Sequence, residues 1–251
     1  MKPDPTLLPT FPTGVLERLA RLPDTRLRPP PSHEGLIALI SDLMRRPWFD
    51  VGAKHYLDDY LRSERLSRTP LLQLQKAKLR RLVWHCFLHV PGYAGPIAEI
   101  LKPAEIEVLD ALERLPIVDS AARRSGDFRA RVTEQDGDHA AELAARRIAL
   151  RLRAARWRSR QVKEADEVGV YAASCEVGDA LHAMADHLLV EVVDEKGGPA
   201  PVGEVGHVLI TDLHNYNTPY LRFDIGVRGR LRAESCRCGR VLPLVELTGE
   251  R

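Results

Sequence analysis

The spacing of apolar residues changes between residues 160 and 167, and this change constrains the fold most strongly. Before it, apolar residues recur every three or four positions, as they do along the buried face of a helix. After it, runs rich in valine and leucine alternate with turns that contain glycine or proline, as in antiparallel sheets. The sequence therefore predicts an α+β fold, with a helical N-terminal half followed by a β-rich, mostly antiparallel C-terminal subdomain.

We expect three parts along the chain. Residues 1–33 are rich in proline, which fixes φ and removes a backbone donor, so this segment is expected to be disordered or extended. Residues 34–160 are expected to form a helical region, and residues 161–251 a β-rich subdomain that a zinc ion staples. The helices are expected at 32–47, Lys54–Arg62, Leu72–His89, Pro103–Glu113 and Asp138–Trp157. The strands are expected at His187–Asp194, Val205–Asp212, Tyr220–Phe223, Gly229–Ala233 and Leu242–Leu247.

The helix over Leu72–His89 is expected to be central to the fold. It follows Thr69-Pro70, a capping residue with proline in the first turn. Its apolar residues lie at the spacing of one buried face. We expect burial of Leu79, Val83, Cys86 and Phe87.

Composition excludes several classes of protein. The formal net charge is +2, which argues against a globally cationic nucleic-acid binder and against a disordered polyelectrolyte. No apolar run approaches the roughly 18–20 residues of a membrane span, and no apolar segment of a secretory signal follows the N-terminus. Four cysteines make no disulfide framework in a chain of 251 residues, so we expect a reducing, cytoplasmic location.

Three cysteines and one histidine have the spacing of a metal site. Cys175 and His182 lie seven positions apart, and Cys236 and Cys238 form a tight pair about sixty residues later. Three thiolates and one imidazole make a tetrahedral set that suits structural Zn²⁺. The alternative is that these are scattered buried cysteines and a surface histidine. Adjacent thiols in one loop are poor core residues, which favours zinc, whereas Cys86 is expected to be an inert core residue.

A basic run lies on the helix expected over Asp138–Trp157 and just beyond it. An apolar stripe of that helix is expected to consist of Ala141, Leu143, Ala144, Ile148, Leu152 and Ala155. Most of the basic residues would then form the opposite, solvated face. They are Arg146, Arg147, Arg151, Arg153, Arg156, Arg158, Arg160 and Lys163. Anion binding by this face is an alternative, but aromatic residues are sparse, so a nucleic-acid partner is not expected.

Two stretches contain short motifs in a fixed order. The first comprises Leu74–Arg80, His89–Tyr93, Leu115–Asp119 and Gly126–Ala130. The second comprises Glu167–Gly169, Cys175, His182, Val190–Val192, Gly203–Gly206, Thr211–Leu213, Pro219–Gly226 and Cys236–Arg240. Together they resemble the phenylacetate–CoA ligase family of AMP-forming (adenylate-forming) enzymes, including its relatives from capsular polysaccharide biosynthesis, and they cover about half of the chain.

The resemblance implies an activity and a set of ligands. Intact relatives activate a carboxylic acid with ATP and Mg²⁺ and then transfer the acyl group to CoA. Glu167 matches the family glutamate that helps hold Mg²⁺ near the adenylate, although a solvated glutamate before a strand is the simpler interpretation. The family includes members with zinc ligands at the positions of Cys175, His182, Cys236 and Cys238. Asp212, Asn215 and Arg222–Asp224 are expected to organise the turn and strand pairing that frame the family's nucleotide pocket.

The chain departs from the family where the nucleotide would bind. Ala130–Asp136 lacks the Ser/Thr/Gly-rich phosphate loop, and Val227 replaces the aspartate that binds the ribose. The family's central α/β portion and its C-terminal lysine domain are also expected to be missing. Three interpretations stay open. The chain is a truncated ligase relative, weak or inactive alone; a non-catalytic zinc-binding module that binds a partner or scaffolds an intact ligase; or a relic without selected activity.

Overall fold

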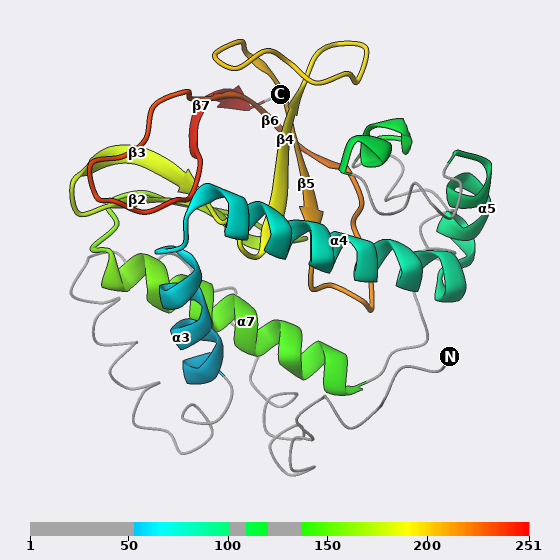
Figure 1. Cartoon of the computed structure of the whole chain (residues 1–251), viewed down its shortest axis with the longest axis horizontal. Helices are drawn as coiled ribbons and strands as arrows, with labels where there is room; N and C mark the ends of the chain where they lie inside the picture. The colour runs from blue at the N-terminus through cyan, green and yellow to red at the C-terminus, as the bar shows by residue number, and fades with distance from the viewer. Residues whose placement is uncertain (1–52, 101–108, 120–136, 251) are drawn as a thin grey trace.

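The computed structural model describes residues 53–100, 109–119 and 137–250. The helical elements in these residues are α3 (Ala53–Ser63), α4 (Arg68–His89), α5 (Pro91–Ile100), the 3₁₀ helix η3 (Leu109–Arg114) and α7 (Gly137–Arg156). The strands are β1 (Val162–Ala165), β2 (Gly169–Cys175), β3 (Gly178–Ala183), β4 (Leu188–Val193), β5 (Gly206–Asp212), β6 (Phe223–Leu231) and β7 (Leu244–Glu250). Helices thus precede an antiparallel sheet, which confirms the predicted α+β fold (Figure 1).

The described strands form one seven-stranded sheet in the order β1-β2-β3-β7-β6-β5-β4. Every neighbouring pair is antiparallel. The last strand, β7, lies between β3 and β6 and so joins the two halves of the sheet. In Figure 1, β2 and β3 run roughly horizontally at the left, whereas β4 and β5 run roughly vertically near the centre. This order brings the segment that precedes β7 close to β2 and β3.

Helices cover the sheet and close two hydrophobic cores. α3 packs against α7, and in Figure 1 α4 crosses in front of the strands. One core joins α3 and α7 to β2, β3, β5 and β7, with Trp157 among its buried side chains. The other joins α4 and α5 to Leu213 and Leu221, which flank the end of β5 and the start of β6. The site described below lies at the rim of the first core.

The central helix agrees with the sequence pattern in most positions. Leu79, Val83 and Cys86 are buried, as predicted, but Phe87 is only partly buried. Two predicted helices fall wholly or partly outside the described residues, as does the proline-rich segment 1–33. Within the predicted Pro103–Glu113 helix, the described residues belong to the 3₁₀ helix η3. No helix in the described ranges is long and apolar enough to cross a membrane.

The strand predictions were right for β4 and β5 but wrong for β6. The predicted Tyr220–Phe223 and Gly229–Ala233 are not separate strands, because one strand runs from Phe223 to Leu231. The pairing register of β6 with β7 shifts between Arg228 and Gly229, as at a β-bulge, and the strand continues beyond this shift. A Cβ at Gly229 would lie 2.6 Å from the carbonyl oxygen of Glu246, so this crossing requires glycine.

The prediction of which face of α7 is buried was wrong for Arg153. Arg153, expected on the solvated face, has 0% exposure, and Ile148 and Ala155 are only half-buried. The Arg153 guanidinium donates to both carboxylate oxygens of Asp186, at 2.5 and 2.9 Å. Ser63 Oγ donates to the same carboxylate at 2.5 Å. A buried arginine is tolerated here because a buried carboxylate neutralises it and satisfies its donors.

Other arginines of the basic run also contact the chain itself. Arg151 makes a bidentate pair with Glu164 of β1, with a shortest distance of 2.7 Å. Arg147 donates to the carbonyl oxygens of Asp166 and Glu167. Arg146 pairs with Glu142 at 2.7 Å and lies over the ring of Tyr56. Arg151 and Arg147 thus tie α7 to β1 and to the turn before β2, whereas Arg146 packs α7 against α3.

Candidate metal centre

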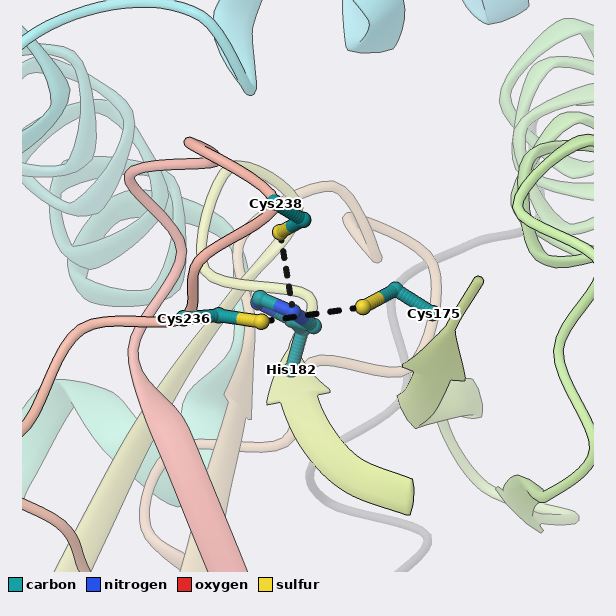
Figure 2. Close-up of side chains that lie close together, drawn as sticks. All are labelled: Cys175, His182, Cys236 and Cys238. Atoms are coloured by element: carbon teal, nitrogen blue, oxygen red, sulfur yellow. Dashed lines mark hydrogen bonds between the residues drawn. The ribbon is translucent and has the colours of Figure 1, made fainter. Parts of the chain in front are cut away.

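Three separate segments bring the four predicted ligands together (Figure 2). Cys175 is the last residue of β2, and His182 lies in β3, where it pairs with Leu244 of β7. Cys236 and Cys238 lie in the loop between β6 and β7. Their ligand atoms all lie within 4.8 Å of one another. This is the single group of its kind found among the described residues, and it can hold a metal ion.

Two contacts within the cluster join residues from different segments of the chain. Cys175 Sγ lies 3.7 Å from Cys236 Sγ, and Cys238 Sγ lies 3.5 Å from His182 Nε2. A disulfide requires sulfur atoms about 2.05 Å apart, so the cysteines are free thiols. Figure 2 shows the three sulfur atoms and the imidazole converging on one small volume.

The backbone sets the tautomer of His182. Its Nδ1 lies 3.3 Å from the carbonyl oxygen of Leu242. A carbonyl can only accept, so Nδ1 carries the proton and Nε2 keeps its lone pair toward the sulfur atoms. Burial is the main cause that lowers the pKa of this imidazole, which keeps it neutral. A neutral imidazole oriented by a backbone carbonyl is the usual arrangement of a metal-ligating histidine.

The thiols have different electrostatic surroundings. Burial raises the pKa of Cys175 to about 11, and the neighbouring thiols add to this effect. Burial also opposes ionisation of Cys238, but hydrogen bonds from the main chain and side chain of Arg240 overcome it and lower the pKa of that thiol. A divalent cation would favour the thiolate form of all three residues.

The structure places Glu167 elsewhere. It is half-buried in the turn between β1 and β2, where its carbonyl oxygen accepts a hydrogen bond from Arg147. It is not part of the Cys/His group. Its predicted role beside Mg²⁺ therefore stays a prediction. Val227, which the sequence resemblance aligns with a ribose-binding aspartate, lies in β6 opposite Glu250 of β7.

The buried side chain of Arg222 joins two distant segments of the chain, η3 and the β4–β5 turn. Arg222 adopts a left-handed backbone conformation with φ of 49°, and its side chain is buried. The guanidinium donates to the carbonyl oxygens of Glu113, Leu115 and Gly197, at 2.6, 2.9 and 2.8 Å. These bonds hold η3 and the β4–β5 turn against the sheet.

A buried polar cluster that the sequence did not indicate lies between α3 and the ends of β4 and β5. Tyr60 Oη and His187 Nδ1 are hydrogen-bonded at 2.7 Å. His187 Nε2 lies 3.6 Å from Asp212 Oδ1, and the imidazole of His214 stacks on that of His187 at 4.9 Å. Burial lowers the pKa of both imidazoles well below its usual value and raises that of Asp212 to about 6.

This cluster predicts a dependence of stability on pH. His214 stays neutral in the folded chain but binds a proton near pH 6.5 when unfolded, so the unfolded state gains protons as the pH falls. We therefore expect each such imidazole to lower the free energy of unfolding as the pH drops below about 6.5, by up to about 1.4 kcal/mol per pH unit. Asp212 opposes this below about pH 6, because its raised pKa makes the folded state take up a proton there. His214→Asn should fall less steeply than the wild type in urea titrations between pH 7.5 and 6. Equal slopes for the two proteins would contradict the account.

Comparison with known proteins agrees with this geometry. The fold is that of adenylate-forming CoA ligases. Solved structures of 2-hydroxyisobutyryl-CoA ligase align with it at TM-scores of 0.59 and 0.57 and 13% and 14% identity. The first is a complex with 2-HIB-AMP and CoA in the thioesterification state, and the second is an open conformation with the same ligands. Each alignment covers 75% of this chain, with 70% and 77% of the respective ligase chains.

A sequence match is more particular. The chain is 43% identical over 60 residues to the phenylacetate-coenzyme A ligase of Thermus thermophilus. The match covers 24% of this chain and 14% of that ligase. No family model matches the chain. The resemblance read from the sequence is thus confirmed by one partial sequence match and by the shared fold.

Proposed function

We propose that this chain is a zinc-stapled relative of the AMP-forming carboxylate–CoA ligases that is weak or inactive in acyl adenylation when alone. The observation that carries this proposal is the convergence of Cys175, His182, Cys236 and Cys238 within a ligase-like fold. Zinc bonds sulfur at about 2.3 Å and nitrogen at about 2.0–2.1 Å, so a tetrahedral ion separates two sulfurs by about 3.8 Å and a sulfur from a nitrogen by about 3.6 Å. The contacts of 3.7 and 3.5 Å fit both values.

The proposed zinc ion has a structural role. Four protein ligands fill a tetrahedral shell and leave no position for water or substrate, as in structural rather than catalytic sites. The ligands also join β2 and β3 to the loop before β7. The ion would therefore fix the order of strands in this half of the sheet.

The residues at the positions of the family's nucleotide-binding motifs support weak or absent adenylation. Attack of a carboxylate on ATP requires an oriented triphosphate and neutralisation of its developing charge. In the resembled family a phosphate loop and a ribose-binding aspartate contribute to this. Here Ala130–Asp136 is not a Ser/Thr/Gly-rich loop, Val227 stands at the aspartate position, and α7 leads almost directly to β1. ATP, Mg²⁺, CoA and a carboxylic acid thus remain proposed ligands of an active relative.

The alternative is a non-catalytic zinc-binding module, or a partner subunit of an intact ligase. A specific observation favours it over a relic. The Arg153 guanidinium and the Asp186 carboxylate, both almost fully buried and far apart in sequence, pair with each other, so two buried charges neutralise one another. Three free thiols next to one another also suit a reducing compartment, consistent with the predicted cytoplasmic location.

An assay of ATP–pyrophosphate exchange tests the proposal. With aryl and short-chain acids and high protein concentration, we expect a rate indistinguishable from that without protein. Each missing electrostatic contact typically costs about 2.7–4 kcal/mol in the transition state, and several are missing together. The control is Glu167→Gln. Turnover by the wild-type chain that disappears in Glu167→Gln would contradict the proposal and favour an active ligase.

A further inference from the structure

The cysteine loop is bound to the helical layer as well as to the sheet. Arg65, in the turn between α3 and α4, donates through Nη1 to the carbonyl oxygen of Cys238 at 3.2 Å. The main-chain amide of Val241 donates to the carbonyl oxygen of Glu64 at 2.9 Å. These bonds span more than 170 residues and place the α3–α4 turn directly on the loop that carries two of the ligands.

Arg240 makes the most extensive contacts between the cysteine loop and the helical layer. It is buried, with 7% exposure. Its Nε lies 3.1 Å from Glu64 Oε1, and its Nη1 lies 3.0 Å from a carboxylate oxygen of Glu176. The guanidinium lies over the ring of Trp157, 4.7 Å from its centroid, and interacts electrostatically with the thiol of Cys238. One side chain thus contacts a metal ligand, the α3–α4 turn and the end of α7.

Glu64 completes a closed circuit of side-chain contacts, here named the ring of contacts. Its carboxylate is 3% exposed, and its second oxygen accepts a hydrogen bond from Trp157 Nε1 at 2.9 Å. The indole of Trp157 in turn meets the ring of His182 edge-on at 5.7 Å. The ring of contacts runs from Cys238 through Arg240, Glu64 and Trp157 back to His182. It starts and ends on proposed metal ligands, and between them it passes through Glu64 and Trp157, which directly follow α3 and α7.

Charge explains why this ring depends on a metal. Zn²⁺ with three thiolates and a neutral imidazole carries a net charge of −1, and such a charge is costly in a buried site unless a cation neutralises it. Arg240 is the cation in contact with that group. Its guanidinium also pairs with the carboxylate of Glu64, so its position depends on both the metal centre and the α3–α4 turn.

We propose that Arg240 and Glu64 couple the metal centre to the docking of the α3–α4 turn and the end of α7, so that zinc stabilises the helical layer and the helical layer strengthens zinc binding. This inference rests on the proposed zinc site. Such coupling is reciprocal, because two events that favour each other must do so by the same free energy. A change at Glu64, which is not a metal ligand, must therefore weaken zinc binding.

Zinc affinity measured by competition with a chelator tests the coupling in the full chain. We expect Glu64→Gln and Arg240→Met to bind zinc about 10–100-fold more weakly than the wild type, as for other residues that orient metal ligands. Arg240→Lys keeps the charge but not the planar fork, and it should recover part of that loss. The matched control is Arg237→Met, in the same loop, whose side chain is exposed. It should stay within about twofold of the wild type.

Hydrogen exchange supplies the second readout. Removal of zinc from the wild-type chain should accelerate exchange at residues 62–67 and 154–158 more than in α5, which lies far from the cysteine loop (Figure 1). Wild-type affinity in both Glu64→Gln and Arg240→Met, or exchange unchanged in these segments, would overturn the coupling while leaving the zinc site intact. A wild-type chain that binds no zinc would overturn the zinc site itself.

Discussion

The double variant Cys236→Ser/Cys238→Ser is expected to lose its zinc and to unfold at a temperature about 10–20 °C below that of the wild type. The two thiolates hold the loop before β7 against β2 and β3, so their loss releases both the ion and the loop. Metal binding that exists only in the folded state adds directly to folding free energy. A loss of about 5 kcal/mol corresponds to this shift for a chain of this size.

Cys86→Ala is the matched control for loss of a thiol. Cys86 is fully buried on α4, and burial raises its pKa, so it is an inert core residue. Its substitution should lower the melting temperature through a cavity but leave the zinc content unchanged. Thermal unfolding followed by circular dichroism, with metal analysis of the same samples, makes the comparison. A double variant that melts with the wild type would refute the structural role.

Arg153→Met is expected to destabilise the fold by about 3–5 kcal/mol. It leaves the carboxylate of Asp186, which is 1% exposed, with the hydroxyl of Ser63 but without its guanidinium partner. Burial alone would raise the pKa of Asp186, and the charge and hydrogen bonds of Arg153 hold it below its usual range instead. Loss of Arg153 therefore leaves a buried charge that must be protonated or hydrated. Urea unfolding at pH 7 measures the difference.

Arg151→Met, two positions away, is the control for this variant. Arg151 also makes a bidentate pair with a carboxylate, but its side chain is 44% exposed and its partner Glu164 is 36% exposed. An exposed pair contributes about 1 kcal/mol or less. Replacement of both buried partners, Arg153→Met/Asp186→Leu, should restore much of the lost stability. Equal effects at Arg151 and Arg153 would show that the pairing with Asp186 carries no special cost.

The helices and two strands could be predicted because their local patterns match their environments. α3, α4 and α7 each repeat apolar residues at helical spacing, and β4 and β5 are runs of Leu, Val and Ile. β2 could not be singled out in this way. Its Tyr171–Cys175 is mostly small residues, yet every residue of the strand is buried. Contacts with neighbouring strands and with α7, rather than intrinsic propensity, make this segment a strand.

The candidate site divides along similar lines. The clustering of the four candidate ligands could be predicted because a Cys-x-Cys pair together with a further cysteine and a histidine is typical of a metal site. Glu64, Trp157 and Arg240 surround these ligands but are remote in sequence, with Glu64 and Arg240 separated by 176 positions. The sequence alone carries no sign that they meet. The burial of Arg153 was missed for the same reason, since its partner Asp186 lies on another element.

X-ray absorption at the zinc edge of the purified full chain tests the central claim most directly. The structure leads us to expect about one zinc ion per chain, bonded to three sulfur atoms at about 2.3 Å and one nitrogen at about 2.0–2.1 Å. Zinc absent from protein prepared without chelators, or bonded to oxygen and nitrogen alone, would contradict the account.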